Sequence, residues 1–504
     1  MLSRIFVLVF ILVAGVARAQ PAAPPDAGVP EPDAAVSEPD AAVPDAAVPD
    51  VARVDAAPPV TAGPPPLPDQ ASGIAVEEDP GIGQSLRWIP RVVLFVPRWA
   101  FWTVAQPFRL GAWAYEKYSL PARVKGVLFN VDETYGVYPV VSYSTDYGLN
   151  AGLRFVHYNL FGHQEHLKLR ANFGGEFQQA YGAEIKTGKL FGDRIQAGIE
   201  SRYERRSHER FFGIGNASEL AEPPAMPVDP TLANAAISSR FRENLIRVVA
   251  TLDVKLGGPF WFHGSGALAI REFSNAADST EPIMARFDTS RLVGYDSGVK
   301  TIYVDGELAY DTRRPTSPWQ PQSIDATGWL VSAHLGRAKG VDGDPTEYTR
   351  YGGELQRYFD LYRGSRTLAL RVLVDGITGS DGLTDGKISF IDLPRLGGTD
   401  YLRGYAQDRF RDRAVVLATA EYSWDLGNFL TGYLFTDAGR TVHTWSQLDT
   451  NLDELHVGFG GGIQVNTAKS FLLRTQLAFS REGDAFFQLA FSPAFGRRER
   501  AGRY

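Results

Sequence analysis

The sequence predicts an all-β protein: a 16-stranded antiparallel transmembrane β-barrel, preceded by a disordered Pro/Ala/Asp-rich tether and a short aromatic amphipathic segment. Three observations support this fold class. Apolar and charged residues alternate with a period of two through residues 126–495 of the 504-residue chain. The links between the alternating segments are long and short in turn, as in outer-membrane barrels. Beyond the N-terminal leader, no apolar run approaches the roughly 20 residues that a membrane-spanning helix requires.

Residues 1–19 have the pattern of a secretory signal peptide. A basic residue precedes a short apolar run, and an A-x-A cleavage site follows at Ala17-Arg18-Ala19. The run is too short to favour the alternative, an uncleaved membrane anchor. The chain contains no cysteine, which excludes disulfides, thiol catalysis, cysteine-ligated metals and a lipid anchor on a cysteine after the cleavage site. We therefore expect an exported protein.

Residues 20–87 form an acidic linker of low complexity. Between residues 20 and 86, eight Asp and four Glu residues stand against Arg53 alone, and the unit Pro-Asp-Ala-Ala-Val recurs. With almost no aromatic or large aliphatic residues, such a segment cannot bury enough apolar surface to offset the entropy lost on ordering. We interpret it as a disordered, semi-extended tether. Because the linker carries the acidic excess, the remaining chain is nearly neutral, and nucleic-acid binding has no electrostatic support.

Residues 88–120 have the opposite composition and contain four of the nine tryptophans. Val92, Phe95, Trp99 and Trp102 fall on one helical face, while three prolines divide the segment into short pieces. Aromatic residues mixed with arginines suit a membrane interface or the mouth of a barrel. The alternative is a helix packed on an ordinary core.

The alternation of residues 126–495 predicts strands with one apolar and one charged face. In the stretch EHLKLRANF, for example, Leu167 and Leu169 share one face, whereas Lys168 and Arg170 share the other. The predicted strands are 134–144, 149–160, 164–175, 179–190, 193–206, 244–257, 260–273, 299–312, 327–339, 347–360, 366–378, 411–424, 428–438, 454–465, 470–480 and 485–495.

The links between these strands favour a membrane barrel over a soluble sandwich, whose strands also alternate. Most long links follow odd-numbered strands and most short turns follow even-numbered ones, with the link at 313–326 as an exception. Apolar faces would then meet outer-membrane lipid, and charged faces would line a wet lumen. Phe487, Leu489, Phe491 and Phe495 share one face of the last strand, and residues 496–504 follow as a C-terminal tail.

The segment GGTDYLRGYAQDRF, from Gly397 to Phe410, lies between the eleventh and twelfth predicted strands. Its tetrapeptide Leu402-Arg403-Gly404-Tyr405 and its position resemble the sixth extracellular loop of the Omp85 superfamily (bacterial surface antigen D15, BamA/TamA-like barrels).

Three further segments carry the same resemblance. FTDAG, from Phe435 to Gly439, resembles the F-x-D-x-G motif of the family's thirteenth strand, and Glu421 occupies the place of an acidic residue on its twelfth. RFFGIGN, at residues 210–216, resembles a segment near the third long loop. The resemblance covers residues 126–495.

Physical chemistry leads to the same loop arrangement. An arginine carried into a lumen on a loop needs carboxylate partners, because an isolated charge away from bulk water is costly. We expect Arg403 to pair with Asp437 and Glu421 and to lock the loop inside the barrel. Gly404 would let the backbone turn tightly against the wall, and Gly397-Gly398 would let the loop fold back. The alternative is a solvated surface turn.

Proline positions suggest a weak closing seam. Pro139 lies in the first predicted strand, and Pro493 lies near Phe495 in the last. Proline donates no ladder hydrogen bond, so we hypothesise a seam with fewer hydrogen bonds than other strand pairs. A lateral gate at this place is what the family resemblance implies. Alternatively, both prolines merely end their strands.

The chemistry of the chain does not favour an enzyme. No H-E-x-x-H, G-x-S-x-G or G-x-x-x-x-G-K-[ST] motif is present, so we expect no catalytic residue, cofactor or metal. The resemblance implies a protein of the bacterial outer membrane that inserts or translocates unfolded outer-membrane proteins, or lipids. The alternative is a passive channel or a structural barrel.

Family assembly factors carry N-terminal POTRA domains, and none fits residues 20–125. This departure leaves open how a client would be captured. The tether, or a periplasmic partner bound through it, would have to serve instead.

Overall fold

The computed structural model describes most of the region predicted to form strands. The predicted signal peptide, linker and aromatic segment lie outside the described residues, as do Pro493 and Phe495. No helix of the described part is both long and apolar enough to span a membrane. The described residues are 128–145, 147–175, 177–216, 226–231, 237–276, 281–316, 325–379, 387–427, 430–449, 452–466, 471–490 and 500.

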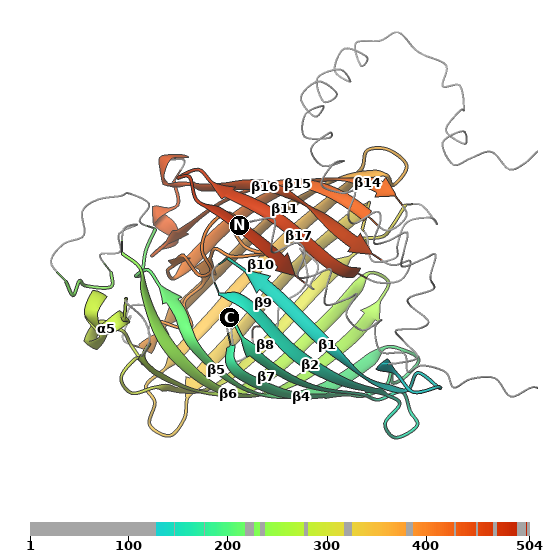
Figure 1. Ribbon diagram of the computed structural model, residues 1–504, viewed down its shortest axis with the longest axis horizontal. Helices are drawn as coiled ribbons and strands as arrows, with labels where there is room; N and C mark the ends of the chain where they lie inside the picture. Colours follow the sequence, from blue (N-terminus) through green and yellow to red (C-terminus); the bar gives the residue numbers. More distant parts are fainter. Residues whose placement is uncertain are drawn as a thin grey trace, which may run out of the picture. The chain divides into compact units, whose positions relative to one another are not determined.

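The strands form a closed antiparallel barrel in which successive barrel strands pair and the last strand closes on the first (Figure 1). Within the described residues sixteen strands make up this barrel, which confirms the predicted fold class. They are β1 (Tyr135–Ser144), β2 (Gly148–Tyr158), β3 (His166–Gly174), β4 (Phe177–Lys186), β5 (Ile195–Phe211), β6 (Ser239–Gly257), β7 (Phe260–Asn275), β8 (Val299–Asp311), β9 (Gly328–Gly340), β10 (Glu347–Asp360), β11 (Arg366–Gly379), β14 (Ala414–Gly427), β15 (Leu430–Val442), β16 (His456–Asn466), β17 (Phe471–Ser480) and β18 (Ala485–Ala490).

Three of the predicted strand boundaries that were wrong have a physical reason in the structure. The fifth and sixth strands were predicted to stop at 206 and to start at 244, but β5 continues to Phe211 and β6 starts at Ser239. A β-bulge between Arg206 and Glu209 interrupts the period of two there. The twelfth strand was predicted from 411, yet β13 (Phe410–Arg411) pairs instead with β12 (Arg395–Leu396) in a separate two-stranded sheet.

The two faces of each strand meet different surroundings. On β8, Val304 and Leu308 are 59% and 52% exposed, whereas Asp305 and Glu307 are 3% and 4% exposed. Alternation along a strand therefore turns the apolar side chains outward toward lipid and the charged ones into the lumen. Closure of the ladder satisfies the backbone hydrogen bonds that lipid could not satisfy.

Loops fill the lumen at the end where the long links lie. An aromatic cluster there joins Phe211 and Phe241, at the ends of β5 and β6, to Phe390 of the segment after β11. Short helices also belong to these loops: α5 (Ile283–Arg286), η2 (Thr289–Arg291), η4 (Trp445–Gln447) and η5 (Leu452–Glu454). The segment that leaves β11 thus enters the barrel.

The closing seam is short among the described residues. β1 pairs with β18 through Tyr143 opposite Leu489 and Ser144 opposite Gln488, whereas β1 and β2 pair over ten positions. Pro139 lies within β1 and opposite Leu153 of β2, so this proline does not end its strand.

Candidate functional site: a loop pinned inside the barrel

The loop between β12 and β13 folds back on itself through residues with positive φ. Gly397, Gly398 and Gly404 have φ of 116°, 102° and 97°, in the left-handed region that glycine adopts without strain. The Gly397 amide donates to the Tyr401 carbonyl at 2.6 Å, and the Gly398 amide donates to the Tyr405 carbonyl at 3.2 Å. The glycines that were predicted to let the loop fold back are thus its turning points.

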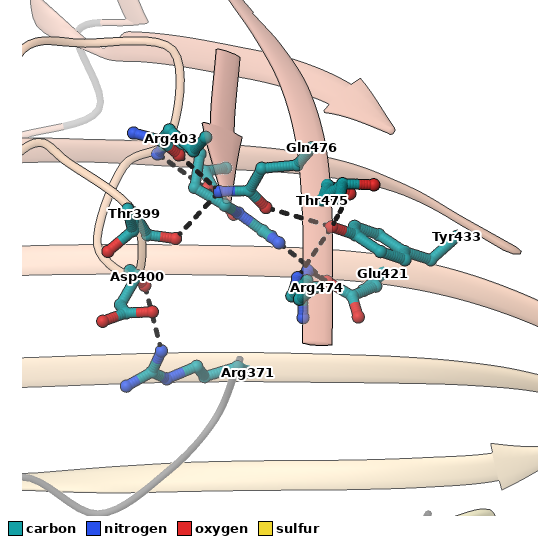
Figure 2. Close-up of polar contacts among 11 residues, drawn as sticks. Arg371, Thr399, Asp400, Arg403, Glu421, Tyr433, Arg474, Thr475 and Gln476 are labelled. Atoms are coloured by element: carbon teal, nitrogen blue, oxygen red, sulfur yellow. Dashed lines mark hydrogen bonds and ion pairs between the residues drawn. The ribbon is translucent and has the colours of Figure 1, made fainter. Parts of the chain in front are cut away.

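Arg403 is the most heavily bonded residue of the loop (Figure 2). Its Nε and Nη2 donate to Oδ2 and Oδ1 of Asp437, each at 2.8 Å, in a bidentate fork. Its Nη1 donates to Oε2 of Glu421 at 2.7 Å, and its backbone amide donates to Asp437 at 2.9 Å. The structure therefore brings together the three residues that were expected to pair.

The ion pair is almost completely shielded from water. Arg403 is 2% exposed and Asp437 is 1% exposed. Burial alone would lower the pKa of the Arg403 guanidinium, but Asp437 and Glu421 outweigh it and raise that pKa above its usual value. The charge is held permanently, so the loop is fixed by electrostatics at any physiological pH.

A second arginine completes the cluster, and sequence reasoning missed it. Arg474 of β17 donates to Oε2 of Glu421 at 2.8 Å and to the Tyr433 hydroxyl at 2.8 Å. Its guanidinium lies 3.9 Å from the centre of the Tyr433 ring. The cluster thus contains two arginines and two carboxylates, so its charges balance. It joins the loop to β14, β15 and β17.

The inner face of β15 explains the FTDAG motif. Tyr433, Phe435, Asp437 and Gly439 follow one another on this face. Phe435 lies beneath the Arg403 guanidinium, 3.6 Å from it, and stands opposite Glu421 in the ladder. The Phe435 ring thus stacks on the guanidinium that the two carboxylates bind. A Cβ on Gly439 would lie 3.0 Å from Leu396, so this glycine leaves room for the base of the loop.

Other loop residues are fastened to neighbouring walls. Tyr405 donates to the Val457 carbonyl at 3.2 Å and to the Glu482 carboxylate, and its ring packs edge-on against Phe410 and His456. Leu402 is fully buried in the apolar cluster at the base of the loop.

Two loop carbonyls accept bonds from the inner faces of β17 and β11 (Figure 2). Gln476 donates to the Thr399 carbonyl at 3.2 Å, and Arg371 donates to the Asp400 carbonyl at 3.4 Å.

The RFFGIGN segment, residues 210–216, lies against the other side of the loop. The Gly215 amide donates to the carbonyl of Arg411 in β13 at 2.8 Å. The Asn216 side chain accepts the Thr441 amide at 2.9 Å. In the sequence this segment stood out only by its resemblance to the family. In the structure it connects the loop to β15.

Gly458 of β16 is a further residue that sequence reasoning missed. A Cβ there would collide with the Arg403 carbonyl oxygen, and a Cβ on Gly404 would collide with the Phe479 carbonyl oxygen. The loop backbone therefore touches the barrel wall without intervening side chains. The only sequence signal was a glycine run, GFGGG, in a predicted strand.

Replacing Gly458 with alanine is expected to destabilise the folded barrel by about 1–3 kcal/mol, the usual cost of overpacking. The added methyl group must push the Arg403 backbone away from Asp437. Urea titration of the folded fraction in detergent measures the change. Gly266→Ala is the matched control, because a Cβ there meets open space. Equal losses of stability in the two variants would contradict the close approach of Gly458 to the Arg403 backbone.

Comparisons with known proteins show the family of the chain. A family model described as the Omp85 superfamily domain matches residues 159–493, which is more than half of the chain. No curated protein matches the sequence. Solved structures that match include BamA from Haemophilus ducreyi lacking POTRA domains 1–3, at 13% identity and a TM-score of 0.48, covering 71% of this chain and 70% of that one.

CdiB structures match at lower scores. CdiB from Acinetobacter baumannii has 12% identity and a TM-score of 0.43, covering 71% of this chain and 59% of that one. CdiB from Escherichia coli has 10% identity and a TM-score of 0.43, covering 70% and 62%. The chain thus spans less than two thirds of both CdiB chains. On the strength of the family match, this chain belongs to the Omp85 superfamily of bacterial outer-membrane β-barrel proteins.

Proposed function

We propose that this barrel inserts or translocates proteins at the outer membrane, with unfolded outer-membrane proteins as its clients, and that it does so without catalytic chemistry. The observation that carries the proposal is the firmly braced wall next to the place where the first and last strands close the barrel. Arg403, Glu421 and Arg474 tie together β14, β15 and β17. The neighbouring strand β18 meets β1 at two described positions.

The barrel opens at this closing seam. Each ladder hydrogen bond contributes about 0.5–1.5 kcal/mol net, and more where lipid replaces water as the competing partner. Pro139 of β1 donates no ladder hydrogen bond, so this strand has one donor fewer to hold it to its neighbours. The freed edges of β1 and β18 would then present unpaired backbone groups to which a client strand can add.

The braced wall limits which strands can move when the seam opens. The Arg403 cluster holds β17 to the loop, so movement at the seam falls on β1 and β18, which contribute no residue to that cluster. Loop residues also occupy the lumen, which gives a passive channel less support than lateral insertion. Client capture would fall to residues 20–125 or to a periplasmic partner.

Reconstitution tests this proposal. Liposomes containing the full-length barrel are expected to fold a urea-unfolded outer-membrane protein faster than empty liposomes, as measured by protease protection and heat-modified gel mobility. Liposomes carrying an unrelated porin serve as the control for membrane defects. Equal folding rates in all three, with ion conductance as the only activity of this barrel, would instead identify a passive channel.

A further inference from the structure

The inner wall beside the closing seam carries cations but no carboxylates. Five neighbouring strands, β17, β18, β1, β2 and β3, contain no Asp or Glu residue within their described bounds. β2 and β3 nevertheless place Arg154 and Arg170 on the inner face, because each follows an outward leucine: Leu153 is 57% exposed and Leu169 is 42% exposed. This wall therefore has an excess of positive charge.

Arg154 and Arg170 belong to a row of four arginines that runs across five strands. Arg154 stands directly opposite Arg170 in the ladder of β2 and β3, and Arg202 stands directly opposite Arg247 in the ladder of β5 and β6. Gly182 of β4 lies between the two pairs, opposite Arg170 on one side and Arg202 on the other. Like charges directly opposite each other are destabilising, since their Cβ atoms are about 4.5–5.5 Å apart. The row therefore requires counter-charges.

Glu200 of β5 is a counter-charge for three of the four arginines. It accepts a hydrogen bond from Nη2 of Arg170, and it lies 2.6 Å from the Arg202 guanidinium and 3.5 Å from that of Arg247. Arg170 reaches it across β4 at Gly182, where a Cβ would lie 2.6 Å from the Arg170 Nε. The negative charge is thus concentrated at the β5 end of the row.

The β2 end of the row lacks such a partner. Among the residues that the structure describes, Arg154 has no ion-pair partner, and its buried Nε has no hydrogen-bond partner. The residues opposite Arg154 are Tyr138 of β1 and Arg170 of β3. Removing a charged group from water without a partner is costly. The Arg154 guanidinium is therefore a positive charge that the described wall leaves uncompensated.

A phosphate group has the chemistry that this end of the row requires. It carries up to two negative charges and several acceptor oxygens, so one phosphate can bridge two guanidinium groups. Arg170 uses Nη2 for Glu200, which leaves its Nη1 to donate to a further acceptor, and its side chain is 26% exposed. A carboxylate, with a single charge, would compensate only one of the two arginines.

We propose that Arg154 and Arg170 form a lumenal binding site for a phosphate group, on the wall beside the closing seam. A soluble oligophosphate and a phosphorylated lipid headgroup present the same group to this site. The first reaches it from the water of the lumen, and the second reaches it from the membrane through the seam between β1 and β18. The site shares no residue with the Arg403 cluster, and its occupation does not require client insertion.

Titration calorimetry on the folded full-length barrel in detergent tests the site. Sodium tripolyphosphate is the soluble probe and dihexanoyl phosphatidic acid is the lipid probe, both at one fixed ionic strength because salt screens such contacts. At least one probe is expected to bind, and Arg154→Gln is expected to weaken that binding about tenfold. Binding of either probe with this loss supports the site and identifies the source of the phosphate. Failure of both probes to bind overturns the proposal.

Arg205→Gln is the matched control. Arg205 lies on the outer face of β5, between the inward-facing Glu204 and Arg206, which are 2% and 6% exposed. Like Arg154, it has no ion-pair partner among the described residues, and its buried Nε makes no hydrogen bond with them. This variant removes the same charge outside the lumen and should bind the probes as the unaltered barrel does. Equal weakening by both variants, or none by Arg154→Gln, overturns the proposal.

Thermal unfolding provides a second readout that does not depend on calorimetry. Arg154→Gln breaks no ion pair with a described residue and removes a repulsion with Arg170, so the unliganded variant should fold at least as stably as the unaltered barrel. The bound probe should raise the Tm of the unaltered barrel and of Arg205→Gln, but not that of Arg154→Gln. Arg154→Lys, which keeps a charge without the planar fork, should show an intermediate rise. The same rise in Tm for Arg154→Gln as for the unaltered barrel would show that the probe binds elsewhere.

Discussion

Arg403→Ala is expected to destabilise the folded barrel by about 3–5 kcal/mol, the range found when one partner of a buried ion pair is removed. The variant leaves Asp437, which is 1% exposed, without its bidentate partner, and leaves Glu421 with Arg474 alone. It also removes the guanidinium stacked on Phe435. Urea titration of the folded fraction in detergent measures the loss.

The loop should also become accessible when this anchor is lost. Arg403→Ala is expected to expose the loop to added protease in intact membranes, because the loop retains only its weaker contacts at Tyr405, Thr399 and Asp400. Arg403→Lys should show an intermediate loss of stability, since an ammonium group cannot form the bidentate fork to Asp437.

Arg337→Ala is the matched control. Arg337 of β9 also pairs with a carboxylate, Glu347 at 2.8 Å, but its side chain is 66% exposed. Exposed pairs contribute only about 0.2–1 kcal/mol, so this variant should unfold nearly as the unaltered protein does. If Arg403→Ala and Arg337→Ala differ by less than about 1 kcal/mol, the buried cluster does not lock the loop.

The strands could be predicted from the sequence because a barrel wall imposes the same alternation of apolar and polar residues along its whole length. Leu167 and Leu169 could be assigned to one face from their spacing alone, and the ladder agrees. The pairing of Arg403 with Asp437 and Glu421 was also foreseeable, because a buried arginine requires carboxylates and few were placed to reach it.

Contacts across the lumen were not foreseeable from local pattern. Arg474 is one of many polar residues on inner faces, and nothing in its surroundings marks it as the second partner of Glu421. Arg500 belongs to a tail without periodicity, so no local pattern marks its contact with β8. The two-residue strands β12 and β13 are too short to leave a periodic signal.

A covalent lock across the seam is expected to abolish client insertion while leaving the barrel folded. Tyr143 and Leu489 stand directly opposite each other on β1 and β18. Opposed residues of antiparallel strands have Cα atoms about 4.5–5.5 Å apart, within the range that a disulfide bridges. Tyr143→Cys with Leu489→Cys, oxidised in the otherwise cysteine-free chain, should reduce folding of the client to the rate of empty liposomes, and a reductant should restore it.

The control disulfide must constrain β1 without joining it to β18. Val141→Cys with Ala151→Cys joins β1 to β2, which already pair over ten positions. If the seam opens during insertion, this lock leaves activity unchanged, because β1 and β2 can move together. Normal insertion by the oxidised seam variant would show that clients do not pass between β1 and β18. Loss of activity in both locked variants would mean that β1 itself must separate from β2, and the opening would then not be confined to the seam between β1 and β18.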